Sequence, residues 1–298
     1  MLPPSIQKLT EGNIKVLSRT ISLVENEAEG YEYLLENLPL KQTKITGITG
    51  PPGAGKSTIT DALIAEKVKD DKRVAVLCVD PSSPFNLGAV LGDRIRMNEW
   101  YTHPNVFIRS MATRGSMGGL NAKIIEVTDV LKAAPFDDII VETVGVGQSE
   151  IEIAGLADTT VVVLVPEAGD EVQTMKAGLM EIADIFVVNK ADRPGADTFI
   201  KNLCQMLAPS FYKKEHSVPV IKTVASQRIG IKELSEKIET HQQLHLPNEK
   251  KIWLLTEKSY NLIQQKRMKD IDKKQIAKEI GELYNSNFNL YKFIRQFC

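Results

Sequence analysis

The stretch GITGPPGAGKST, residues 47–58, decides the fold that the sequence predicts. It contains the pattern GxxxxGK[ST], follows an apolar strand-like run and opens the helix-like sequence STITDALIAEKV. In that context, glycines let backbone N–H groups surround an anion, and the start of the helix supplies further donors. We therefore expect a phosphate-binding loop that contacts nucleotide through Gly50, Pro51, Pro52, Gly53, Ala54, Gly55, Lys56, Ser57 and Thr58.

Short apolar runs, most of them rich in Val and Ile, recur downstream of this loop and alternate with helix-length amphipathic stretches. This alternation predicts βαβ units and an α/β fold of the P-loop NTPase class, with a mostly parallel central sheet flanked by helices. Ligands of such sheets bind beyond the carboxyl ends of the strands. The expected strands are 44–50, 73–80, 105–111, 137–143, 159–166, 184–192 and 218–225; the expected helices include 56–69, 118–133, 172–182 and 195–208.

Helical sequence flanks this region at both ends. Apolar residues recur at helical spacing within residues 5–38, and Pro39 closes that segment. Beyond residue 231 the strand-like runs cease and the sequence is again helical, ending in the aromatic stretch FNLYKFIRQFC. We expect an N-terminal helical extension (1–40), a P-loop domain (41–235) and a C-terminal helical region (236–298). The last region suits either a helical cap or an oligomer surface.

Composition narrows the class of protein. The chain has 298 residues and a net charge of −1, which does not favour nucleic acid or acidic membrane as a main partner. Three widely spaced cysteines argue against a disulfide framework, and CxxC, HExxH and His-rich tracts are missing. The N-terminus lacks an apolar signal core, and the run VVVLV is too short to span a bilayer. We expect a cytoplasmic protein.

The sequence VVNKAD, residues 187–192, predicts which base the site binds. At the end of a later strand, Asn-Lys-x-Asp is typical of P-loop GTPases, in which the aspartate accepts both the N1–H and the 2-amino protons of guanine. Asp192 would give this preference for GTP, since adenine offers no such pair, while Asn189 and Lys190 would hold the base. The following strand ends in TVAS, and we expect guanine contacts from Val224, Ala225 and Ser226, with the Ala225 N–H on the base O6.

A single acid ends the apolar run 139–141. Glu142-Thr-Val-Gly145 stands where many GTPases have DxxG, so the carboxylate is expected to face Mg²⁺ and the glycine N–H to lie near the γ-phosphate. Gln148 is a candidate for orienting the attacking water, or a loop glutamine without a catalytic duty. The expected catalytic residues are Lys56, Glu142 and Gln148, and the expected metal ligands are Ser57, Asp80, Asp93 and Glu142, not all of them in direct contact.

Five longer blocks carry a family resemblance. They are VDPSSPFNLGAVLGDRIRM, SMATRGSMGGL, VETVGVGQSE, PEAGDEVQTMKAG and ADIFVVNKAD. Together they resemble the methylmalonyl-CoA mutase-associated GTPases of the MeaB/ArgK type, the family of the human cobalamin-disorder type A protein, from about residue 9 to the C-terminal helices. The resemblance implies a Mg²⁺-dependent GTPase that serves as chaperone of an adenosylcobalamin-dependent acyl-CoA mutase, gating cofactor loading and protecting the mutase. It also implies a homodimer held largely by C-terminal helices.

The family's functional residues carry over by motif. Lys56, Ser57, Asp80, Asp93 and Glu142 match its phosphate and magnesium residues; Asn189, Lys190 and Asp192 match its guanine site. Residues 170–176 match a third switch loop that relays the nucleotide state to the mutase. Glu167-Ala168 stand where the family often has Gly-Ala, and Val224 replaces the usual serine. Chains of this type have also been labelled amino-acid transport kinases, for which these residues give no support.

Two other functions remain open at this stage. A metallocentre-insertion GTPase of the nickel-chaperone class would share the fold, although such proteins usually carry His-rich or Cys-containing metal sites and this chain has four His. A small-molecule kinase would share the phosphate loop but not the NKxD sequence. Among mutases, methylmalonyl-CoA mutase is the expected partner, and isobutyryl-CoA- and ethylmalonyl-CoA-type mutases use similar chemistry.

Overall fold

The computed structural model describes residues 4–80, 97–113, 120–145, 149–167, 178–211, 218–244, 249–284 and 288–297. The chain divides into two compact units, residues 1–251 and 252–298, and the division falls within one helix. The domain boundaries that the sequence suggests, after residues 40 and 235, stay predictions.

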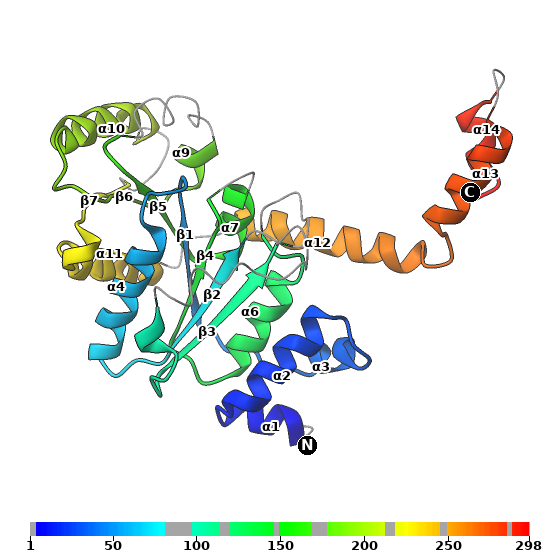
Figure 1. The fold of residues 1–298 in the computed structure, drawn as a ribbon, viewed down its shortest axis with the longest axis horizontal. Coiled ribbons are helices and arrows are strands. Elements are labelled where there is room, and N and C mark those ends of the chain that lie inside the picture. The colour runs from blue at the N-terminus through cyan, green and yellow to red at the C-terminus, as the bar shows by residue number, and fades with distance from the viewer. Residues whose placement is uncertain are drawn as a thin grey trace. The chain divides into compact units, whose positions relative to one another are not determined.

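A parallel sheet forms the centre of the first unit (Figure 1). In the part of the chain that the structure describes, seven strands lie in the order β3-β2-β4-β1-β5-β6-β7, and each neighbouring pair is parallel. The strands are β1 (Lys44–Thr49), β2 (Val74–Asp80), β3 (Val106–Ala112), β4 (Asp138–Glu142), β5 (Thr159–Leu164), β6 (Ile185–Val188) and β7 (Val220–Lys222). The predicted fold class and each of the seven predicted strands are confirmed.

Both faces of the sheet are buried, which explains the continuous apolar runs. Successive side chains of a strand point to opposite faces. In β5, Val161 and Val163 belong to one core cluster, and Val162 and Leu164 belong to the other. The first cluster includes residues of α4 (Lys56–Lys69) and α11 (Ile231–Gln243). The second includes residues of α7 (Ser149–Leu156), α9 (Gly178–Ile182) and α10 (Ala196–Phe211).

A network of charged side chains fixes α4 and α11 to the amino-terminal end of β4. Lys67 Nζ lies 3.3 Å from Asp138 Oδ1 and 3.0 Å from Glu239 Oε1, and Lys72 Nζ lies 2.6 Å from the same Glu239 oxygen. The hydrogen bond from Lys72 lowers the pKa of Glu239. Burial opposes the charged form of Lys72, but its contacts with Glu239 and Asp138 prevail and raise its pKa. The network therefore holds the covering helices at the end of the sheet remote from the phosphate loop.

The N-terminal segment is helical as predicted, but it is broken into α1 (Pro4–Thr10), α2 (Ile14–Glu25) and α3 (Tyr31–Glu36). Asn13 ends the first break by accepting a hydrogen bond from the Val16 N–H, which caps α2. Helix α2 packs against α6 (Ile124–Ala133). Arg109 of β3 reaches this extension through an ion pair with Glu25. The N-terminal helices are therefore joined to the sheet by charge as well as by apolar packing.

The C-terminal region is helical, as the sequence predicts: α12 (Glu249–Arg267), α13 (Lys273–Leu283) and α14 (Leu290–Ile294). Its aromatic end forms a chain of ring contacts from Tyr284 through Phe288 and Phe293 to Phe297, with centroid separations of 5.5–6.0 Å. Many large apolar side chains of this unit are exposed nonetheless, among them Ile252, Trp253, Tyr260 and Tyr291. Within the described ranges, we find no helix with the length and apolar character needed to cross a membrane.

Candidate nucleotide site

The predicted phosphate loop joins the carboxyl end of β1 to the first residue of α4. Gly55 caps the helix with φ 92°, in the left-handed region that favours glycine. A Cβ atom at this position would lie 2.3 Å from Nδ2 of Asn189, so a side chain has no room. The same Asn189 nitrogen donates to the carbonyl oxygen of Ala54 over 2.9 Å. The loop is therefore held against the end of β6 through its own backbone.

Lys56 is buried, and its ammonium group bonds within the loop. Nζ donates to the carbonyl oxygens of Gly50 and Pro51 over 2.9 and 3.1 Å. Gly145, which follows β4, lies against this group: a Cβ atom built there would be 2.3 Å from Lys56 Nζ and 2.5 Å from the Gly50 oxygen. The predicted catalytic lysine and the glycine of the ExxG segment are thus brought into contact, although they are 89 positions apart in the sequence.

Glu142 is an acid at the end of the buried strand β4, and its carboxylate contacts helix α4. It is buried between β1 and β2, in register with Ile48 and Cys78. The Ser57 hydroxyl donates to Oε1 of Glu142 over 2.5 Å. A hydroxyl oxygen and a carboxylate are both oxygen ligands of the kind that Mg²⁺ prefers. The oxygen donors of Ser57 and Glu142 therefore fit Mg²⁺, and their roles as its ligands stay predictions.

The other predicted metal and catalytic residues are placed only in part. Asp80 ends β2, two residues beyond the Cys78 that pairs with Glu142, so both acids lie toward the same edge of the sheet. Asp93 and Gln148 fall outside the residues that the structure describes, as do residues 170–176. Among the described residues, no group of three or more His, Cys, Asp or Glu side chains could hold a metal ion.

Asn189 joins the base-binding segments to one another. Its Oδ1 accepts from the Thr223 hydroxyl and from the Ala225 N–H, each over 3.1 Å, while its Nδ2 holds Ala54. The Asn189 side chain is buried, and it connects the phosphate loop with the segment after β7 through these hydrogen bonds. Because the Ala225 N–H already donates to Asn189, the expected contact with guanine O6 would require a shared or altered bond, and it stays a prediction.

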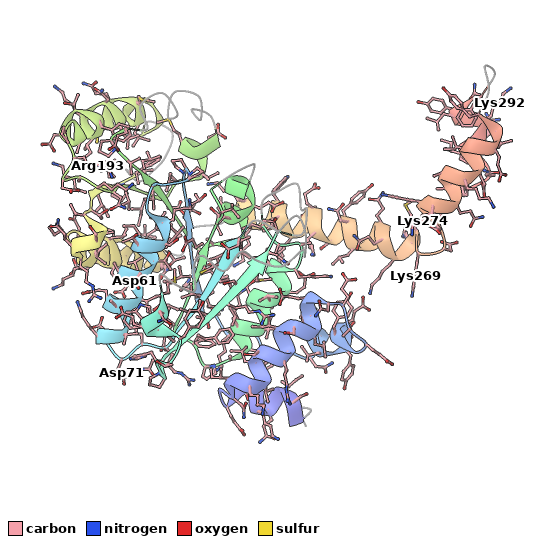
Figure 2. All side chains as sticks on the ribbon, viewed as in Figure 1. Asp61, Asp71, Arg193, Lys269, Lys274 and Lys292 are labelled. Carbon is pink, nitrogen blue, oxygen red and sulfur yellow. The ribbon has the colours of Figure 1, made fainter. Side chains whose placement is uncertain are left out.

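Lys190, Asp192 and Arg193 lie in the segment that follows Asn189. Lys190 has φ 56° and donates from Nζ to the Gly53 carbonyl oxygen over 2.7 Å, so its stem runs along the phosphate loop. Asp192, the predicted guanine acceptor, is exposed to solvent. Arg193, labelled in Figure 2, pairs with Glu167 at 2.5 Å, and its hydrogen bond lowers the pKa of that glutamate. This pair connects the base loop with the segment after β5.

Sequence reasoning missed two hydroxyl groups. Thr60 donates to Oε2 of Glu142 over 2.8 Å, and Thr223 donates to Asn189. Thr60 follows Ser57 by three positions, which places both on one face of a helix. The spacing of the two hydroxyl groups could have indicated a shared partner, but it does so only once β4 is known to lie beside α4.

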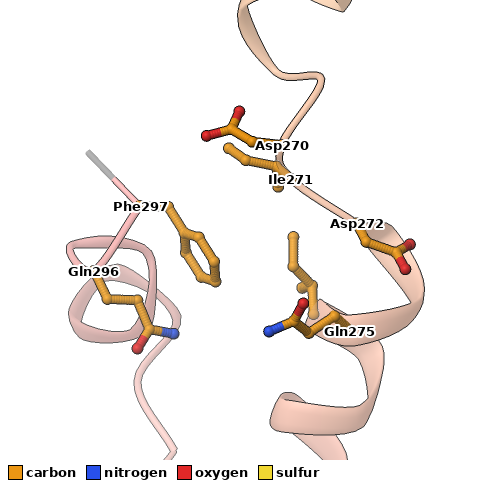
Figure 3. A pocket seen from close by; sticks show the side chains of 7 residues that line it. Asp270, Ile271, Asp272, Gln275, Gln296 and Phe297 are labelled. Carbon is orange, nitrogen blue, oxygen red and sulfur yellow. The ribbon is translucent and has the colours of Figure 1, made fainter.

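A separate pocket lies within the C-terminal unit. It encloses about 250 Å³ and is lined by Asp270, Ile271, Asp272, Gln275, Ile276, Gln296 and Phe297. Figure 3 shows Gln296 and Phe297 facing Ile271 and Gln275 across it. The lining contains none of the residues of the phosphate loop or the base site, so the pocket is distinct from the candidate nucleotide site.

Comparison with known proteins agrees with this geometry. The family described as "Methylmalonyl Co-A mutase-associated GTPase MeaB" matches residues 17–279. A putative GTPase of Pyrococcus abyssi is 50% identical over 248 residues, covering 82% of this chain and 76% of the relative. The fused isobutyryl-CoA mutase of Geobacillus kaustophilus is 35% identical over 237 residues, 74% of this chain and 22% of that protein. A crystal structure described as "LAO/AO transport system kinase" superposes with a TM-score of 0.68 at 26% identity, covering 98% of this chain and 88% of the other.

Proposed function

The chain belongs to the family of methylmalonyl-CoA mutase-associated GTPases, and from this premise we propose that it is a Mg²⁺-dependent GTPase that serves as chaperone of an adenosylcobalamin-dependent acyl-CoA mutase. Its reaction is hydrolysis of GTP to GDP and phosphate. The proposal couples GTP binding and hydrolysis to loading of the cobalamin cofactor and to protection of the mutase.

One observation carries the GTPase part: Asn189, Lys190 and the phosphate loop are bonded into a single constellation. Asn189 holds Ala54, and Lys190 holds Gly53, so the loop for the phosphates and the loop for the base keep a fixed spacing. A guanine nucleotide would bridge them, with its base at Asp192 and its phosphates at Lys56. Positioning and charge stabilisation supply most of the rate of phosphoryl transfer, which such a constellation suits.

Magnesium is part of the proposal because of the oxygen donors beside the phosphate loop. Ser57 would ligate the ion, with Glu142 and Asp80 bonding to it or to its water ligands. When bound, Mg²⁺ neutralises charge that develops on the β- and γ-phosphate oxygens. Lys56 would supply a further positive charge to these phosphate oxygens. The ordinary oxygen chemistry of these residues supports this assignment.

Two observations support a mutase as the partner: the family to which the chain belongs, and a relative in which a similar region is part of a longer protein named as a mutase. In the Geobacillus protein named as a fused isobutyryl-CoA mutase, the region similar to this chain is 22% of the whole. A GTPase covalently joined to a mutase in one protein supports association of separate chains in another. Methylmalonyl-CoA mutase is the proposed partner, with isobutyryl-CoA mutase as the second candidate.

A homodimer formed by the C-terminal unit is also proposed. Exposed apolar side chains are numerous on α12, including Ile252, Trp253, Leu255, Tyr260 and Ile263. Exposed apolar area of this kind needs cover in water. A second copy of the same helix would supply it. We also propose a cytoplasmic location.

The experiment that tests the function is GTP hydrolysis by the purified chain with and without candidate mutases. We expect free phosphate to appear faster with the partner mutase, and the acceleration to vanish in Lys56→Ala. Absence of acceleration and of a complex with every candidate would remove the mutase role while leaving GTP hydrolysis intact. A phosphorylated small-molecule product would instead support a kinase.

A further inference from the structure

Thr60 lies one helical turn beyond the phosphate loop and contacts the acid that ends β4. Its hydroxyl is fully buried on α4 and lies 2.8 Å from Oε2 of Glu142. Ser57, three positions earlier on the same helix, donates to Oε1 of that carboxylate. One carboxylate thus receives a hydroxyl of the same helix at each of its oxygens.

We propose that Thr60 is a positioning residue of the magnesium site, which holds the Glu142 carboxylate in the rotation that presents Oε1 to Ser57 and to the ion's ligand shell. The inference rests on the proposed Mg²⁺ dependence and extends it to a residue outside the GxxxxGK[ST] pattern. Thr60 acts through Glu142 and touches neither nucleotide nor metal.

The hydroxyl has one proton and two acceptors within reach. Besides Glu142 Oε2, it lies 3.0 Å from the carbonyl oxygen of Lys56, the usual i−4 partner of a helical threonine. The contact with the carboxylate is the shorter, and a hydrogen bond to an ionised acceptor is the stronger. The Thr60 hydroxyl therefore donates its proton mainly to the Glu142 carboxylate, and its hydrogen bond to the Lys56 carbonyl oxygen is the weaker of the two.

The length of the acid explains why two donors are needed. Glutamate has one more rotatable bond than the aspartate of DxxG, so its carboxylate must be fixed against an additional rotation. Glu142 is buried between β1 and β2, where water is a poor substitute for a fixed donor. A hydroxyl one turn along α4 supplies the second fixed point, since residues three apart share a helix face.

The test measures how strongly Mg²⁺ and guanine nucleotide bind together, in the full chain. The affinity for a fluorescent GDP analogue is determined with saturating Mg²⁺ and again with EDTA, and the ratio of the two gives the coupling. We expect Thr60→Val, which removes the hydroxyl and keeps the shape, to reduce the ratio about tenfold, as loss of an outer-shell partner commonly does. Affinity in EDTA should be unchanged.

Two variants separate positioning from a structural effect. Thr60→Ser keeps the hydroxyl and should restore the coupling to within about threefold of the wild type. Thr128→Val makes the same change at a fully buried threonine of α6, whose hydroxyl donates to the Ile125 carbonyl away from the site, and should leave the coupling unchanged. Thr60→Ala replaces Thr60→Val if the latter does not fold.

The possible outcomes lead to different conclusions. A wild-type ratio in Thr60→Val overturns the positioning role while Mg²⁺ dependence stands. Equal loss of affinity with Mg²⁺ and with EDTA also overturns it, because it would indicate damage to the nucleotide site itself. If the wild-type protein binds the GDP analogue equally well with Mg²⁺ and with EDTA, the proposed metal dependence is refuted, and so is the role of Thr60 that rests on it.

Discussion

Lys190 donates from Nζ to the carbonyl oxygen of Gly53 over 2.7 Å, and so connects the predicted base-recognition segment directly to the phosphate loop. The two residues are 137 positions apart in the chain. Because Lys190 adopts φ 56°, its side chain leaves the strand end toward this loop while Asn189 turns inward and Asp192 faces solvent. Lys190 thus contacts the backbone of the phosphate loop, so its contribution to binding should not depend on whether the nucleotide carries a γ-phosphate.

Lys190→Ala should weaken binding of GTP and of GDP equally, by about fivefold, the value of one ordinary hydrogen bond. Equilibrium competition against a fluorescent GDP analogue measures both affinities. Lys201→Ala, at an exposed position of α10, serves as the matched control and should change neither. A loss confined to GTP would show that Lys190 senses the γ-phosphate and would contradict the structural reason given.

Asp192→Asn should reverse the base preference. The carboxylate is expected to accept two guanine protons, and an amide in its place presents a donor where the 2-amino group also donates. Loss of one bond to a charged acceptor, together with two donors that face each other, should weaken GTP binding roughly a hundredfold. Xanthosine triphosphate, which carries an oxygen at that position, should gain affinity relative to GTP. Direct titration with both nucleotides checks this, and an unchanged GTP affinity would refute the guanine assignment.

Gly145→Ala should reduce GTP hydrolysis roughly a hundredfold, since small displacements of reacting groups have effects of that order. The new Cβ would lie 2.3 Å from Lys56 Nζ and 2.5 Å from the Gly50 carbonyl oxygen, so the loop or the lysine must shift. Single-turnover phosphate release measures the effect.

Gly30→Ala provides the control for Gly145→Ala. Gly30 has φ 86°, against 83° for Gly145, yet an added Cβ meets nothing within 4 Å. Both variants should lose about 1–2 kcal/mol of stability from the strained backbone. Only Gly145→Ala should lose hydrolysis; equal activities would show that contact with Lys56 is unimportant.

Glu239→Gln should make stability less dependent on acid pH. The folded-state pKa of Glu239 is lowered by the hydrogen bond from Lys72, so its contribution is present above the unfolded pKa of about 4.3 and is lost as pH falls through the lower folded pKa. Since the side chain is 38% exposed, we expect about 1 kcal/mol or less at pH 7. Urea unfolding at pH 7 and below pH 4 should show a difference from wild type that shrinks in acid.

Glu236→Gln on the same helix is the control for Glu239→Gln. Its carboxylate faces Lys232 at 4.0 Å and both side chains are largely exposed, so its removal should change the free energy of unfolding less. A difference for Glu239→Gln that grows as pH falls would contradict the sign derived from the lowered pKa.

Ile252→Lys combined with Tyr260→Lys should convert a dimer to a monomer. The two side chains are 68% and 65% exposed on α12, and two ammonium groups within an apolar interface would lose their hydration. Light scattering at micromolar concentration reports the mass. Tyr33→Lys, at a 62% exposed position of α3, should leave the mass unchanged. A wild type that is monomeric would remove the proposed homodimer.

Much of the fold could be read from local patterns. The run 44–49, the GxxxxGK[ST] loop and the amphipathic stretch 56–69 each recur in the structure within one residue of the predicted bounds. Such patterns depend on neighbours in the chain, on periodicity and on turn chemistry. The N-terminal extension shows their limit: the helical spacing was correct, but the break near Gly30, with its φ of 86°, divides one predicted segment into separate helices.

The sequence also predicts site residues at the ends of strands. A parallel sheet brings the carboxyl ends of its strands to one edge, so Asn189 and Glu142 are both expected near the phosphate loop, the first at the base and the second at Mg²⁺. The Ala225 N–H shows what this reasoning cannot resolve. The sequence predicts a guanine contact for this segment, but the bond that its N–H makes to Asn189 depends on the orientation of one amide.

The sequence by itself determined the class of fold, the nucleotide-binding motifs and the family, because each is written in residues that lie close together in the chain. Only the tertiary structure decided that the strands lie in the order β3-β2-β4-β1-β5-β6-β7, and that Thr60 and Ser57 share the two oxygens of Glu142. Thr60 and Glu142 are 82 positions apart. Hydrogen bonds act over about 3 Å, and sequence spacing fixes distances of that size only within a helical turn or a strand pair.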